Sequence, residues 1–81
     1  MTKEEIEPYW NKKAQILVGK TIKETRYMTD EEAEKFGWYK KPLIIIFTDG
    51  TYIMPMMDDE GNDGGSLEGS KDELSFPTLN L

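Results

Sequence analysis

The stretch from Pro42 to Met57 constrains the fold more than any other part of the chain. Two runs of apolar, mainly β-branched and aromatic residues flank the dipeptide Asp49-Gly50. An Asp-Gly pair between such runs is the strongest short-range signal for a β-hairpin, because glycine accepts the positive φ that tight turns require. The sequence therefore predicts a hairpin over this range, with Gly50 at positive φ.

Both faces of the predicted hairpin are apolar. A two-residue turn would place Phe47 opposite Tyr52 on one face, and Ile45 opposite Met54 on the same face. The other face then carries Ile46 and Ile53. A strand pair that is apolar on both faces is typical of the centre of a sheet with a covering layer on each side.

Apolar residues recur at roughly helical spacing near the N-terminus, which predicts a helix over about residues 5–17. Thr2 and Glu5 form a capping-box pattern. Pro8 fits a first helical turn, so it favours a helix that begins near Glu7 instead. The residues that give the spacing are Ile6, Tyr9, Trp10, Ala14 and Leu17.

A strand is predicted after this helix. Gly19 is expected to end the helix, and the run from Thr21 to Met28 is rich in Thr, Ile and Tyr, which is typical of a strand. Its alternation of apolar and polar residues is poor. A bulge near Glu24–Thr25 would correct the alternation, as would a position at the edge of the sheet.

A short second helix follows. Thr29 and Glu32 form a capping box, and the acidic residues from Asp30 to Glu32 oppose the positive end of the helix dipole. Gly37 is expected to end a helix of one or two turns. We expect this helix to bury Ala33 and Phe36.

Trp38 and Tyr39 lie beside Lys40 and Lys41 in an aromatic and basic cluster. Such a cluster can stack on nucleic-acid bases or bind a peptide. The commoner arrangement folds the indole over the core and leaves the lysines in solvent. We expect Trp38 to be at least partly buried, against Phe36 and the hairpin.

The C-terminal part of the predicted hairpin leads into a loop and a weak tail. Pro55 has no amide to donate, so the ladder between the two hairpin strands should stop before it. Glycines and acidic residues predict a flexible loop at about residues 58–66. Residues 74–79 could add a short strand, which Pro77 confines to an edge.

The net charge of −6 is concentrated in the last third of the chain. Residues 1–57 contain nine basic and nine acidic residues, whereas residues 58–81 contain seven acidic residues and one basic residue. Such a field repels nucleic-acid backbones and attracts cations or basic protein surfaces. Direct nucleic-acid binding is therefore not expected.

The composition excludes several kinds of chemistry. The chain has no cysteine and no histidine, so it cannot form a disulfide, a thiolate metal site or a Ser–His or Cys–His nucleophilic pair. The remaining carboxylates, lysines and tyrosines would need a substrate cleft, which so short a chain rarely provides. We therefore do not expect this chain to be an enzyme. The longest apolar run, Leu43–Phe47, is too short to span a bilayer, so we expect a soluble cytoplasmic protein without membrane contact.

The acidic loop is the main candidate site. Carboxylates with interspersed glycines provide the oxygen ligands that calcium prefers, although the spacing does not fit an EF-hand. The loop could equally be a solvated turn or a surface that a basic partner recognises. Methionines at the end of the hairpin could extend that surface, because methionine side chains adapt to varied contacts. The candidate partner-binding residues are Met56, Met57, Asp58, Asp59, Glu60, Asn62 and Asp63, and the candidate metal ligands are Asp58, Asp59 and Asp63.

One stretch of the chain resembles a known group of proteins. The run TDEEAEKFGW, the segment Pro42-Leu-Ile-Ile-Ile and the run from Asp58 to Gly65, DDEGNDGG, are similar to small uncharacterised proteins of bacteria and bacteriophages. No activity is known for that group. The resemblance implies a microbial or viral accessory protein and no mechanism.

Together these patterns predict a single α+β domain over residues 1–81. An N-terminal helix would lie on a small, mainly antiparallel, curved sheet of three or four strands, with a short helix crossing between the first two strands. A partial barrel is one form that such a curved sheet can take. We expect a non-catalytic module that binds or regulates a protein partner. Calcium binding through the acidic loop and mimicry of nucleic acid by the acidic surface remain alternatives. The sequence does not indicate an oligomeric state.

Overall fold

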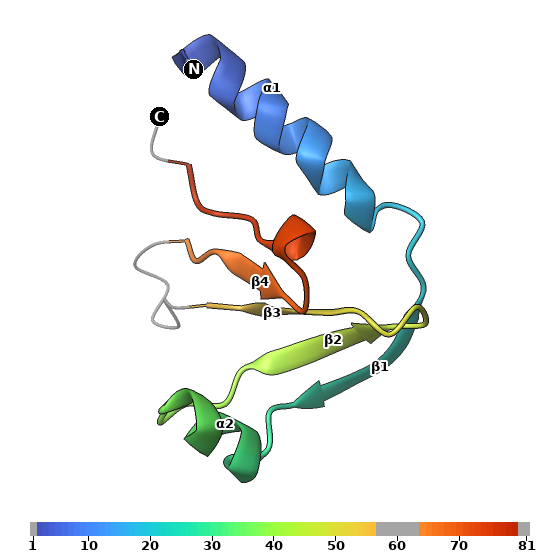
Figure 1. Cartoon of the computed structure of the whole chain (residues 1–81), viewed down its shortest axis with the longest axis vertical. Helices are drawn as coiled ribbons and strands as arrows, with labels where there is room; N and C mark the ends of the chain where they lie inside the picture. The colour runs from blue at the N-terminus through green and yellow to red at the C-terminus, as the bar shows by residue number, and fades with distance from the viewer. Residues whose placement is uncertain (1, 57–63, 80–81) are drawn as a thin grey trace.

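The computed structural model describes residues 2–56 and 64–79. It has an α+β fold with one four-stranded antiparallel sheet in the order β1-β2-β3-β4 (Figure 1). The two outer strands are not neighbours, so the sheet is not closed into a barrel. The elements are α1 (Lys3–Ala14), the 3-10 turn η1 (Gln15–Leu17), β1 (Ile22–Tyr27), α2 (Asp30–Phe36), β2 (Leu43–Phe47), β3 (Tyr52–Pro55), β4 (Leu67–Gly69) and the 3-10 turn η2 (Asp72–Leu74).

The central hairpin β2–β3 forms as predicted, but its register differs by one residue. Ile45 lies opposite Ile53, and Ile46 lies opposite Tyr52, so the predicted pairs Phe47–Tyr52 and Ile45–Met54 are wrong. The turn contains three residues, because the Phe47 amide donates to the Thr51 carbonyl at 2.8 Å. Gly50 has φ +87°, as expected for the glycine that ends a three-residue turn.

The two faces of the hairpin bury different residues, and each face has its own cover. On one face α2 and Trp38 pack over a cluster of Met28, Ala33, Ile44 and Met54. On the other face Leu17 and the C-terminal segment pack over a cluster of Phe47, Ile53 and Leu74. The expectation of a central hairpin that is covered on both sides is therefore confirmed.

Pro55 also acts as predicted. The pairing between β2 and β3 stops before it, and Pro55 pairs instead with Leu67 of β4 on its other side.

Strand β1 confirms both sequence interpretations of its poor alternation. It is an edge strand, and its register with β2 shifts between Ile22 and Glu24. This irregularity lies one residue from the predicted bulge.

Helix α1 begins earlier than predicted and has Pro8 in its interior. Thr2 is the N-cap residue, but its side chain makes no capping hydrogen bond, so the predicted box with Glu5 is absent. No residue of α1 is buried. In Figure 1 the C-terminal segment and η2 lie between α1 and β4, and the apolar cluster on that face is contacted by Leu17 of η1.

Helix α2 matches its sequence signature closely. The Thr29 hydroxyl accepts from the Glu32 amide at 3.2 Å, and the Glu32 carboxylate accepts from the Thr29 amide at 2.8 Å. Gly37 ends the helix with φ +73°. Ala33 is buried, as predicted, but Phe36 is 52% exposed.

The C-terminal region contains a strand that the sequence did not indicate. Strand β4 falls where a loop and a weak tail were expected, and the predicted edge strand over residues 74–79 is reduced to a single bridge between Leu67 and Phe76. Leu74 is 1% exposed. A Cβ atom on Gly69 would collide with the Leu74 side chain and the Tyr52 carbonyl, so only glycine lets Leu74 pack this closely.

The turn geometry predicts a large effect of substituting Gly50. Gly50→Val should lower the free energy of unfolding by more than about 1 kcal/mol, because a β-branched residue is strained at this positive φ. Gly50→Asn should cost less, since asparagine tolerates this region. Thermal melts of the three proteins measure the difference. Equal midpoints for the valine and asparagine variants would show that backbone strain at Gly50 does not determine the loss of stability.

Candidate functional site

The predicted acidic site lies almost wholly outside the described residues. This applies to Met57, Asp58, Asp59, Glu60, Asn62 and Asp63. Met56, the last described residue before this segment, is half-buried, and its amide donates to the Ser66 carbonyl at 2.8 Å. The acidic run therefore joins two paired strands, β3 and β4, and its two ends are held together.

Residues 2–56 and 64–79 contain no group of three carboxylates that could hold a metal ion. The candidate metal ligands Asp58, Asp59 and Asp63 fall in the interval between these ranges, so the calcium interpretation stays a prediction. The same described ranges contain no helix of the length and apolar character needed to cross a membrane.

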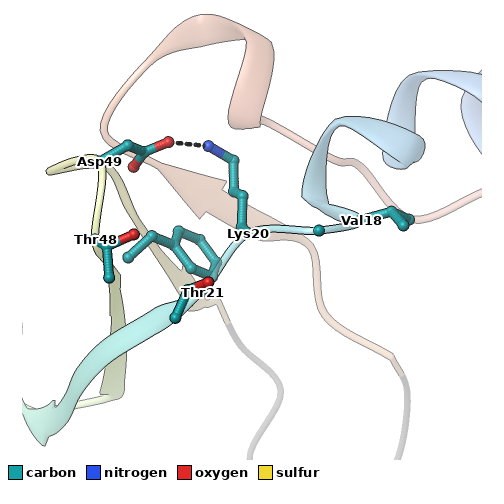
Figure 2. Close-up of a pocket in the computed structure, with 7 residues that line it drawn as sticks. Val18, Lys20, Thr21, Thr48 and Asp49 are labelled. Atoms are coloured by element: carbon teal, nitrogen blue, oxygen red, sulfur yellow. Dashed lines mark hydrogen bonds and ion pairs between the residues drawn. The ribbon is translucent and has the colours of Figure 1, made fainter.

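An open hollow of about 290 Å³ lies where the N-terminal segment meets the hairpin turn (Figure 2). Lys20 points across it and forms an ion pair with Asp49. The Lys20 ammonium also lies 3.3 Å from the Thr51 hydroxyl and 5.4 Å from the centre of the Phe47 ring. The residues that line the hollow are Val18, Gly19, Lys20, Thr21, Phe47, Thr48 and Asp49.

The two charged side chains of this hollow bond to each other and to Thr51. The Asp49 carboxylate accepts from Lys20 and from the Thr51 hydroxyl and amide. These bonds hold the pKa of Asp49 well below its ordinary range. The cluster therefore ties the start of β1 to the turn of the hairpin, and it offers no unpaired acid or base for catalysis. The sequence does not indicate this ion pair, since a lone lysine and a turn aspartate 29 residues apart share no local pattern.

A second ion-pair network links β1 to α2. The Arg26 guanidinium donates to both oxygens of Glu32, at 2.8 and 3.0 Å, and lies 3.8 Å from Glu24. The same Glu32 carboxylate closes the capping box of α2. These hydrogen bonds, first from Arg26 and then from the Thr29 amide, lower the pKa of Glu32 from 4.5 to about 2.

This lowered pKa predicts a pH dependence of stability. Because the pKa of Glu32 is lower in the folded protein, its contribution is fully present above about pH 4.5 and is lost as the pH falls towards 2. Glu32→Gln keeps a carbonyl for the capping box but loses the ion pair. It should flatten the dependence of the unfolding midpoint on pH in this window, as measured by urea titrations at several pH values.

Glu31→Gln is the charge-matched control on the same helix. If the two variants show the same pH dependence, the Arg26–Glu32 pair does not contribute to it.

The aromatic and basic cluster divides into a packed half and an exposed half. Trp38 packs on the core and stacks on Phe36, with ring centres 4.8 Å apart. The expectation for Trp38 is therefore confirmed. Tyr39 is fully exposed, and Lys41 forms an ion pair with Asp30 at 2.8 Å. This hydrogen bond raises the pKa of Lys41 and lowers that of Asp30.

This division predicts a large loss of stability for one substitution and almost none for its neighbour. Trp38→Ala should lower the free energy of unfolding by about 2–3 kcal/mol, less than for a fully buried indole because Trp38 is only half-buried. Tyr39→Ala should change it by no more than about 0.5 kcal/mol. Denaturant titrations of both variants test this. A stability loss of similar size in both would mean that Tyr39 also packs in the core.

Several large apolar side chains lie at the surface. Helix α1, the connection that follows it and strand β1 contribute most of them, and Val18 and Tyr27 are about 70% exposed. Exposed apolar side chains that lie near one another mark contact surfaces in many proteins. The exposed large apolar residues are Tyr9, Ile16, Val18, Ile22, Tyr27, Phe36, Tyr39 and Leu79.

No protein-family model, curated protein or solved structure matches this chain. The fold and the surfaces described above are therefore the basis of any functional conclusion.

Proposed function

We propose that this chain is a non-catalytic module that binds or regulates a protein partner, and that the partner presents a basic surface to the acidic loop. The resemblance noted above makes a bacterial or bacteriophage accessory protein, acting in the cytoplasm, the setting of this proposal. Nucleic acid is not expected to bind directly, because the charge of the last third repels phosphate.

The position of the acidic segment is the observation that carries the proposal. The segment joins β3 to β4, and the hydrogen bond between Met56 and Ser66 holds its ends together. Five acidic or amide side chains thus fall in one connection between two paired strands. The acidic residues closely follow Met56 in the sequence. Their charge would attract a basic partner over a distance, and the apolar, half-buried Met56 would offer it a desolvated contact.

The hollow at Lys20 supports a non-catalytic role for the described residues. Its one lysine and one carboxylate are paired with each other and with Thr51. A catalytic acid or base must be free to give or take a substrate proton, whereas these two groups are engaged with each other and with Thr51.

Capture experiments test the proposal. The chain is immobilised and exposed to a lysate, and bound proteins are identified by mass spectrometry. Neutralising the loop with Asp58→Asn, Asp59→Asn and Asp63→Asn should reduce capture of a specific protein about tenfold or more, because the attraction to its basic surface is lost.

The matched control carries the same change of three charges elsewhere, in Glu7→Gln, Glu34→Gln and Glu73→Gln. It should capture the partner as the parent does. Equal capture by both folded triple variants would contradict the role of the loop.

The same variants separate the alternatives. A rise in melting midpoint with calcium, absent with sodium chloride at equal ionic strength and abolished in the loop variant, would favour a calcium site. A captured partner that releases the chain when DNA or RNA is added would favour mimicry of nucleic acid.

A further inference from the structure

The outer edge of β1 is the most exposed backbone in the sheet. β1 has six residues, pairs with β2 on one side only, and five of its six residues are exposed. In Figure 1 it forms the lower margin of the sheet, away from α1 and from the C-terminal segment. The opposite edge, β4, has three residues and is partly covered by the bridge to Phe76. An open edge offers a row of unpaired backbone donors and acceptors to another strand.

The pairing with β2 determines which groups of β1 point outward. The Met28 amide donates to the Pro42 carbonyl at 2.9 Å, and Arg26 lies opposite Ile44 in the antiparallel ladder. Successive residues of a strand direct their amide and carbonyl groups to opposite sides. Thr25 and Tyr27 therefore direct theirs away from the sheet, where both groups of Thr25 and the Tyr27 amide face outward and the Tyr27 carbonyl accepts from the Arg26 guanidinium at 3.2 Å.

Charge then selects one register for a second copy of the same strand. Outward residues of one strand must face outward residues of the other, so the two-fold axis of an antiparallel β1 pair passes through a residue and not between two residues. In the middle of the strand this residue is Glu24, Thr25 or Arg26. An axis through Glu24 or through Arg26 places two like charges opposite each other, which is destabilising. Centring on Thr25 places Glu24 of each copy opposite Arg26 of the other.

We propose that two copies of this chain associate through their β1 edges, antiparallel and centred on Thr25. The two threonines face each other as a hydrogen-bonded pair, and two Glu24–Arg26 pairs flank them. The regular part of the ladder ends there, because the register of β1 shifts between Ile22 and Glu24. Beyond it, the stem of Lys23 of each copy lies near Tyr27 of the other, a tyrosine that is 68% exposed. The eight-stranded sheet that results is continuous across the two copies.

The distribution of charge permits this contact. Residues 1–57 have no net charge, and the excess of acid lies after residue 57. Arg26 is already fixed by its two bonds to Glu32 and lies 3.8 Å from Glu24 of its own chain. Little side-chain entropy is therefore lost when it also meets Glu24 of the second copy. A pair of such short strands buries less surface than the roughly 1,200–2,000 Å² that stable interfaces bury. The dimer is therefore reversible, and its population rises with concentration.

Sedimentation equilibrium tests the association directly. The parent chain should shift from monomer to dimer across the micromolar to millimolar range. Glu24→Arg sets two arginines opposite each other twice per dimer and should weaken the association about tenfold or more. Glu7→Arg makes the same change of charge on exposed α1 and should associate as the parent does.

Single cysteines test the register, since the natural chain has none. Thr25→Cys places one thiol on each side of the two-fold axis, where facing Cα atoms are about 5.5 Å apart and a disulfide can form. It should oxidise in air to a covalent dimer much faster than Lys23→Cys, whose two thiols lie at opposite ends of the ladder.

Three results would overturn the proposal. A parent chain that stays monomeric at millimolar concentration would show that two copies do not pair through β1, and the edge would then be open only to a strand of another protein. Equal association of the Glu24→Arg and Glu7→Arg variants would show that Glu24–Arg26 pairs between the copies are not part of the contact. Equal oxidation rates of the Thr25→Cys and Lys23→Cys variants would exclude the register centred on Thr25. This test does not depend on whether the Glu24→Arg variant folds.

Discussion

The apolar character of both faces of the β2–β3 hairpin governs the rest of the structure. Ile44 and Ile45 are neighbours in the chain, yet they point into different clusters on opposite sides of the sheet. Each face must then be covered, because exposed apolar surface costs about 25 cal/mol per Å². The short helix α2 covers one face. The C-terminal segment, through Leu74, covers the other.

A chain of this length cannot cover everything. Once the C-terminal segment occupies its face of the sheet, α1 has no large surface left on which to pack, and none of its residues is buried. The edge of β1 and several large apolar side chains also remain at the surface. Incomplete coverage of this kind is expected of a small chain, and the open edge of β1 is the part of it on which the proposed pairing of two copies rests.

Local chemistry made some elements predictable and others not. The capping box of α2, Gly37, Gly50 and the limit at Pro55 follow from single-residue properties, so the sequence indicates them correctly. The hairpin register depended on one extra turn residue, which Asp49-Gly50 does not specify. Strand β4 and the Lys20–Asp49 pair depend on contacts between distant segments, and no local pattern encodes them. Within the predicted site, Met56 is the one residue that the structure describes.

Native-state hydrogen exchange, residue by residue, tests the central claim that the hairpin with its two covers is the core and α1 is peripheral. The amides of Ile45 and Ile53 should exchange only by global unfolding, because they lie in the middle of the buried ladder. The amides of α1 should exchange orders of magnitude faster in the isolated protein, since the helix is anchored by no buried residue. Protection in α1 equal to that in β2 and β3 would contradict the account.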